Sequence, residues 1–138
     1  MAYNTIKIKK YSDVIEEATA AAPFTPGHLI EFTSAGKVRA HSTATGTALP
    51  MFALEDELQG KGITEAYSTD NLVQCWIAGR GDMVYALLNS GESVTAGDFL
   101  ESAGNGNLQA LTTGTPIAQA VETVNASGGT ARIVVRIL

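Results

Sequence analysis

Few side chains in this sequence have the types and the spacing that chemistry requires. The two histidines, His28 and His41, approach one another only if the segment between them folds back as a hairpin. Zinc takes about four ligands in proteins, and the sequence designates no third ligand beside these two imidazoles. Both histidines are therefore predicted to be ordinary surface residues, and no metal site is expected.

The densest run of carboxylates is Glu55, Asp56 and Glu57. Calcium takes about six to eight oxygen ligands, and consecutive side chains leaving a strand on alternating faces cannot all point to one ion. General acid–base catalysis needs a second positioned group in a cleft, which the sequence does not supply. A solvated acidic rim is predicted here rather than a cation site or a catalytic centre.

The tripeptide Arg80-Gly81-Asp82 is also found in some adhesion ligands. A match of three residues arises easily by chance, and Gly-Asp before an apolar run fits an ordinary hairpin turn. We interpret the tripeptide as a turn. Arg80 itself, at the end of a predicted strand, is a candidate for an interface and otherwise an ordinary surface arginine.

The sequence patterns of serine hydrolases, phosphate-binding loops, helical zinc proteases and calcium-binding loops are absent. Trp76 stands in an apolar run, where a tryptophan is more typical of a core than of a ligand platform. Cys75 is the sole cysteine, so the chain has no internal disulfide and intracellular assembly is expected. Neither an enzyme nor a cofactor is predicted.

Composition sets the class of protein that carries these side chains. A chain of 138 residues with 45% hydrophobic and 17% charged residues suits one packed domain, and its 14 glycines and short apolar runs favour a mainly β protein. A net charge of −5 argues against broad nucleic-acid binding. No apolar window reaches the roughly 18 residues of a membrane span, so a soluble protein without a membrane partner is expected.

Residues 25–40 return as residues 95–110. Each copy places a turn, a short apolar strand, a glycine turn and a second strand in the same order. Each is followed by Gly-Thr and an apolar run ending in an acid, which extends the two units to 25–55 and 95–122. The repeat predicts a small single-domain β-barrel or sandwich with two related β-units, formed by residues 25–138.

Strong strand patterns occur outside the repeat. Residues 71–77 and 83–88 are apolar runs separated by a turn and are predicted to form a hairpin central to the core. Residues 131–138 alternate two faces, and a chain that ends on so strong a strand is expected to use it to close the sheet.

Residues 1–24 are predicted to form a separate, extended N-terminal arm and connector. Apolar and charged residues alternate through 3–10, as in a strand with two different faces. Two interpretations stay open: an edge strand protected by lysines in its own domain, or an arm that adds its strand to a neighbouring protein. For residues 12–22, a short helix with Ser12 as its N-cap competes with an extended connector.

These strands and turns resemble the head decoration proteins of tailed bacteriophages, also called capsid cement proteins. The resemblance spans nearly the full chain and includes Thr25-Pro26-Gly27-His28 and Arg80-Gly81-Asp82. The resembling segments are residues 25–31, 34–38, 51–63, 73–76, 80–82, 97–102 and 132–137.

The resemblance implies a structural virion protein that binds the outer surface of the expanded icosahedral capsid and reinforces it against the pressure of packaged DNA. The implied partner is the major capsid protein, the implied assembly is a homotrimer, and the implied location is the virion, assembled in the host cytoplasm. The arm supplies the implied contact residues, which are Ile6, Lys7, Ile8, Lys9 and Lys10. The alternative is a small β-barrel module on the virion that binds carbohydrate or a host surface, although the supply of aromatic residues for such a groove is thin.

Overall fold

The computed structural model describes residues 2–11 and 13–138. It confirms the predicted fold class: the chain is a small, mainly β single domain with a closed five-stranded β-barrel. One 3-10 turn, η1 (Glu57–Gln59), accompanies the strands. The strands of the first half are β1 (Lys7–Lys9), β2 (Ile15–Thr19), β3 (Ile30–Phe32), β4 (Val38–Ala40), β5 (Met51–Ala53) and β6 (Leu72–Ile77). Those of the second half are β7 (Met83–Leu88), β8 (Ser93–Val94), β9 (Phe99–Ser102), β10 (Leu108–Ala110), β11 (Ala118–Ala120), β12 (Val124–Asn125) and β13 (Ala131–Ile137).

The barrel follows the strand order β7-β10-β9-β11-β13 and closes because β13 returns to pair with β7. That antiparallel pairing runs from Ala131 opposite Leu88 to Arg136 opposite Met83. Residues 131–138 therefore close the sheet, as the sequence predicted. Side chains from every barrel strand fill its interior, including Leu88, Leu100, Leu108, Ala118 and Ile133.

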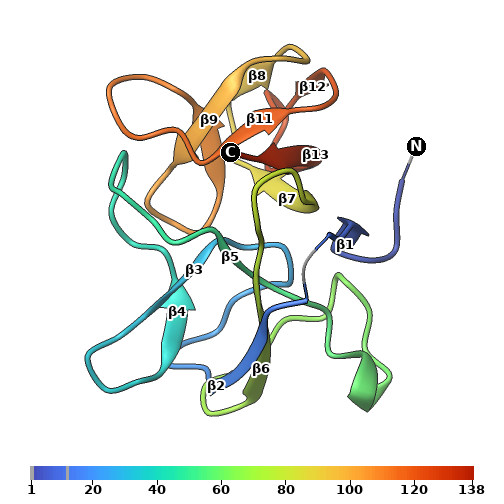
Figure 1. The fold of residues 1–138 in the computed structure, drawn as a ribbon, viewed down its shortest axis with the longest axis vertical. Coiled ribbons are helices and arrows are strands. Elements are labelled where there is room, and N and C mark those ends of the chain that lie inside the picture. The colour runs from blue at the N-terminus through green and yellow to red at the C-terminus, as the bar shows by residue number, and fades with distance from the viewer. Residues whose placement is uncertain (1, 12) are drawn as a thin grey trace.

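A second, smaller layer lies beside the barrel. It consists of the sheet β2-β6-β5 and the hairpin β3-β4, and Figure 1 shows β2, β4 and β6 in the half of the molecule away from the barrel. Strand β6 joins the two layers because its successive side chains face opposite sides. Trp76 packs in the barrel's core, whereas Val73 and Cys75 pack in the core of the second layer.

The two predicted repeat units are present as two antiparallel hairpins, β3-β4 and β9-β10. Corresponding positions pair in both: Glu31 lies opposite Arg39 in the first hairpin, and Glu101 lies opposite Gln109 in the second. The difference lies in their packing, since β9-β10 is part of the barrel and β3-β4 is not.

The turn that opens each unit is also repeated in atomic detail. The Thr25 N–H donates to His28 Nδ1 at 3.0 Å, and the Thr95 N–H donates to an Asp98 carboxylate oxygen at 2.9 Å. Residues 79–82 form a third copy, in which the Gly79 N–H donates to Asp82 at 2.8 Å. The third residue of each turn has a positive φ that glycine adopts without strain, namely Gly27, Gly81 and Gly97.

The predicted hairpin of residues 71–77 and 83–88 is wrong. Strand β6 pairs with β2 and β5, whereas β7 pairs with β1, β10 and β13, so the turn at 79–82 carries the chain from one layer to the other. Both strands are apolar over most of their length, and such a strand carries little information about its partner.

The helix considered for residues 12–22 is also wrong, and the extended alternative is confirmed. Residues 15–19 form β2, which pairs antiparallel with β6 from Ile15 opposite Trp76 to Thr19 opposite Leu72. Ser12, the expected N-cap, lies outside the described residues. A helix this short is marginal alone, so pairing with the edge of β6 prevails over local propensity.

Candidate interaction surface

The arm strand is packed on its own domain. Strand β1 pairs antiparallel with β7, with Lys7 opposite Val84 and Lys9 opposite Met83, and a register shift lies between the two pairs. Ile6 is fully buried, and its N–H donates to Glu55 Oε1 at 3.3 Å. Of the two interpretations of this segment, the structure contains the strand that belongs to its own domain. Ile6 is buried in the barrel core and Ile8 is partly buried against it, so these side chains are not available to another protein while β1 stays paired.

The charged residues of the arm lie outward. The Lys9 ammonium lies 5.8 Å from the centre of the Tyr11 ring, and the Lys10 ammonium lies 3.0 Å from a carboxylate oxygen of Asp13. Lys7 is half-buried beside Glu55 and Glu57, where it lines a small hollow. The contact role of these lysines remains a prediction.

Lys9, Arg80 and Arg136 gather where β7 begins, and we call this group the basic end. Lys9 and Arg136 flank Met83 from the two neighbouring strands, and Arg136 Nη2 lies 3.5 Å from the Met83 sulfur. Arg80 precedes Gly81, whose N–H donates to the carbonyl of the residue after Arg136. Within residues 2–11 and 13–138, none of these three cations has an ion-pair partner. Arg136 was missed from the sequence because its role depends on the pairing of β13 with β7.

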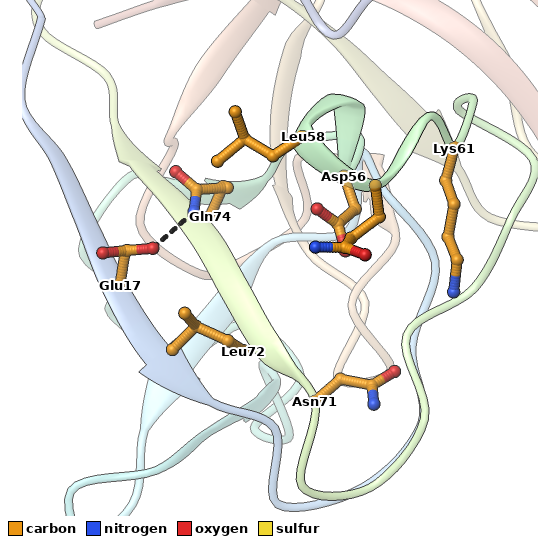
Figure 2. A pocket seen from close by; sticks show the side chains of 8 residues that line it. Glu17, Asp56, Leu58, Lys61, Asn71, Leu72 and Gln74 are labelled. Atoms are coloured by element: carbon orange, nitrogen blue, oxygen red, sulfur yellow. Dashed lines mark hydrogen bonds between the residues drawn. The ribbon is translucent and has the colours of Figure 1, made fainter.

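A groove with a volume of about 280 Å³ lies over the face of β2 and β6. Figure 2 shows its two walls, with strand residues on one side and the segment around η1 on the other. Leu58 and Leu72, both lining it, are 77% and 54% exposed. The remaining lining residues are polar or charged: Glu17, Asp56, Gln59, Lys61, Asn71 and Gln74.

The predicted acidic rim is only partly correct. Asp56 and Glu57 lie at the surface and line the groove and its neighbouring hollow. Glu55 is 7% exposed and accepts a hydrogen bond from the backbone of Ile6, so it is a structural anchor for β1 rather than a solvated carboxylate. This contact could not be predicted from sequence patterns, because the two residues are separated by 49 positions.

The expectation of two ordinary surface histidines is wrong. His41 is buried, with Nδ1 at 2.7 Å from Ser102 Oγ and Nε2 at 3.6 Å from Glu31 Oε1. An acid, a histidine and a serine in this order have the connectivity of a hydrolytic triad. Ser102 is fully buried, however, and its oxygen also accepts the Gly104 N–H. In this arrangement the group connects the two repeat units and cannot reach a substrate.

His28 has a structural part as well. Its Nδ1 accepts the Thr25 N–H in the first repeated turn, and the side chain is partly buried. Burial lowers the pKa of His28; a hydrogen bond between the imidazole and Asn107 opposes this, and the nearby Arg132 charge lowers the pKa further. Throughout residues 2–11 and 13–138, no three His, Cys, Asp or Glu side chains are grouped to hold a metal ion.

The buried thiol of Cys75 is expected to be unreactive. Burial raises the pKa of Cys75 to about 12, and the charge of Glu16 contributes in the same direction. The nucleophilic form is the thiolate, which is scarce at neutral pH when the pKa is this high. Cys75 therefore acts as a small core residue.

Glu101, the second-unit counterpart of Glu31, is a fully buried carboxylate. Its Oε1 accepts hydrogen bonds from the backbone N–H of Thr112 and, at 2.6 Å, from the Thr112 hydroxyl. Burial by itself raises the pKa of Glu101, but these hydrogen bonds outweigh it and hold the pKa below the ordinary 4.5. The first unit has the same pattern in weaker form, because the Ser42 hydroxyl donates to the partly exposed Glu31.

We predict that Glu101→Gln lowers the free energy of unfolding at neutral pH by about 1–3 kcal/mol, because a neutral amide oxygen accepts the hydrogen bonds of Thr112 less strongly than a carboxylate does, and the amide NH₂ would face the Gly114 N–H. The folded-state pKa is below the unfolded one, so the carboxylate stabilises the fold above the unfolded pKa and loses this effect as pH falls through the folded value. Urea unfolding of both proteins from neutral pH downward should show the difference shrinking below pH 4.5. Glu31→Gln is the matched control, and a loss from Glu101→Gln no larger than from Glu31→Gln would contradict the assignment.

No protein-family model matches the chain, and no curated protein matches it either. The fold and the surface together define a small closed β-barrel with a basic end and a separate groove beside β2. None of the helices among the described residues is long and apolar enough to cross a membrane.

Proposed function

We propose that this chain is a structural virion protein of a tailed bacteriophage. It binds the outer surface of the expanded icosahedral capsid and reinforces the shell against internal DNA pressure. The near full-length resemblance to head decoration proteins supports the proposal, as does the closed β-barrel that this resemblance implies. The observation that carries it is the basic end, three cations without ion-pair partners among the described residues, in a chain with a net charge of −5.

The mechanism is mechanical and requires no bond to be made or broken. A trimer that bridges several capsid subunits adds buried area across the seams that the outward pressure of packaged DNA would otherwise separate. Each specific contact of this kind buries about 800 Å² per partner, and the symmetry of the shell repeats it many times. Many modest contacts then resist an outward force together.

The basic end gives this contact its chemistry. Lys9 projects from the outer face of β1, and Arg80 and Arg136 extend the positive surface beyond the arm. An acidic rim on the capsid protein would attract this basic surface. The same rim would repel the acidic remainder of the chain, and the two effects together fix the orientation of docking. In this geometry Ile6 and Ile8 anchor β1 to the barrel core, and the lysines of the arm make the contact with the capsid.

The carbohydrate-binding alternative receives less support from the surface. Trp76, the residue with the largest ring, is fully buried and offers no stacking platform. None of the exposed rings of Tyr3, Tyr11, Phe32 and Phe99 lines the groove. A sugar site needs aromatic faces that converge on one hollow.

Reversing the basic end is the direct test. We expect the triple variant Lys9→Glu, Arg80→Glu and Arg136→Glu to lose binding to purified expanded capsids by about tenfold or more, because each reversal turns an attraction into a repulsion. Co-sedimentation measures the loss. This change is sharper than deleting residues 1–10, which would also remove the buried Ile6 from the core.

The matched control is Lys37→Glu, which reverses a charge near the β3-β4 turn and should leave binding unchanged. Thermal unfolding of both proteins checks that the barrel is intact. A folded triple variant that binds as well as the native chain would refute the basic end as the contact, and a folded native protein that fails to bind cognate shells would refute the function.

A further inference from the structure

We propose that β2 and the adjoining groove form an acceptor site for an extended, lysine- or arginine-bearing segment of a partner protein, which adds a strand to the β2-β6-β5 sheet. This surface is separate from the basic end. Within the proposed function the partner is a capsid subunit, so only the identity of the partner rests on that function.

Strand β2 is the outer strand of the β2-β6-β5 sheet. Its far end is covered, because Ala20 bridges to Val38 of β4 and the Ala21 N–H donates to the Val38 carbonyl at 2.7 Å, so the open edge is the part around Ile15 and Glu17. The Val14 carbonyl accepts the Ile77 N–H at 2.9 Å, and the Ala20 N–H donates to the Asn71 carbonyl at 2.8 Å, so even-numbered residues of this strand direct their backbone toward β6. In an antiparallel pair the intervening residues direct theirs away. The N–H and C=O groups of Ile15 and Glu17 therefore point outward, and no hydrogen bond to them from another described segment is found.

The side chains beside this edge suit an extended segment of a partner protein. Ile15, Glu17 and Thr19 share one face of β2, and that face continues across β6 into the groove. Leu58 and Leu72 expose apolar surface in the groove, and Val14, 48% exposed, does so at the start of the edge. A strand added to β2 would place alternate side chains over the groove, where these leucines provide an apolar contact.

The charges around the groove determine which kind of segment binds. Glu16 and Glu17 are exposed on β2, and Asp56 and Glu57 line the opposite wall and the neighbouring hollow, against the lysines Lys7 and Lys61. A second copy that paired β2 against β2 would bring the glutamates of both strands together, which is destabilising and protects the edge from self-association. A segment with lysine or arginine at alternate positions meets the carboxylates instead.

The test uses the full chain and a short synthetic peptide that alternates valine and lysine. Nuclear magnetic resonance of the amide groups should show slower hydrogen exchange at Ile15 and Glu17, by about tenfold at saturating peptide, because both amides become hydrogen-bonded. The same peptide with every backbone amide N-methylated keeps its side chains but has no N–H donor on either edge, and it should leave both amides unprotected. A valine–glutamate peptide should not bind, and the double variant Glu16→Lys and Glu17→Lys should reverse this preference.

The proposal is overturned if the lysine peptide leaves Ile15 and Glu17 unprotected, or if the N-methylated peptide protects them equally well. Equal binding of the glutamate peptide would overturn the charge argument and with it the proposed partner chemistry. The outcomes are separable from those of the proposed function. A protein that accepts the lysine peptide but does not bind expanded capsids would retain the acceptor site and lose the virion assignment.

Discussion

A chain that ends at residue 130 is expected not to fold. The deletion removes β13, the strand that pairs with β7 along one side and with β11 along the other, so the barrel loses its closure. It also removes Ile133, Val135 and Ile137, all nearly or fully buried. Large buried aliphatic side chains cost about 2–5 kcal/mol each when reduced to alanine, and a domain has only about 5–15 kcal/mol of stability in total.

Far-ultraviolet circular dichroism with thermal unfolding measures this result. The truncated chain should lack a cooperative transition and should aggregate, because β7 and β11 would both expose unpaired edges. The control lacks only Leu138, which is 42% exposed and lies outside the strand, and it should unfold as the native chain does. A soluble product ending at residue 130 that melts cooperatively would show that the barrel does not depend on β13.

The strands could be predicted from sequence because the signals that define them are local. The turn at 25–28 and its repeat at 95–98 depend on residues three positions apart, and in both the backbone N–H of the first residue donates to the side chain of the fourth. Which strands pair with one another does not depend on local signals. Strands β6 and β7 adjoin in sequence and have similar apolar character, yet they pair in different sheets, since the pairing depends on β2 and β13 from the two ends of the chain.

The same distinction separates the parts of the candidate surface. Lys9 and Arg80 were predicted from an alternating strand and from the end of an apolar run. Arg136 joins them only after β13 has returned to β7, and the groove exists only because β2 lies against β6. The burial of His41 was missed for the same reason, because its partner Ser102 lies 61 positions away.

The contact between the two repeat units explains why some glycines of the second unit cannot be replaced. The loop after β4 packs on the second hairpin, where the Thr45 N–H donates to the Ser102 carbonyl at 2.9 Å. A Cβ on Gly114 would lie 2.3 Å from the Thr45 carbonyl oxygen and 2.6 Å from Glu101 Oε2. Neither neighbour can retreat easily, since one is backbone and the other belongs to a fully buried side chain.

Gly114→Ala is therefore expected to destabilise the fold by about 3 kcal/mol or more, because one methyl group forces apart two packed segments of the interior. Urea unfolding at neutral pH measures the change. The matched control is Gly128→Ala, where an added Cβ meets nothing within 4 Å, and its effect should stay within about 0.5 kcal/mol. Comparable small losses from both substitutions would mean that the loop containing Thr45 moves freely away from the second unit, in which case His41 and Ser102 could not connect the two units as the geometry requires.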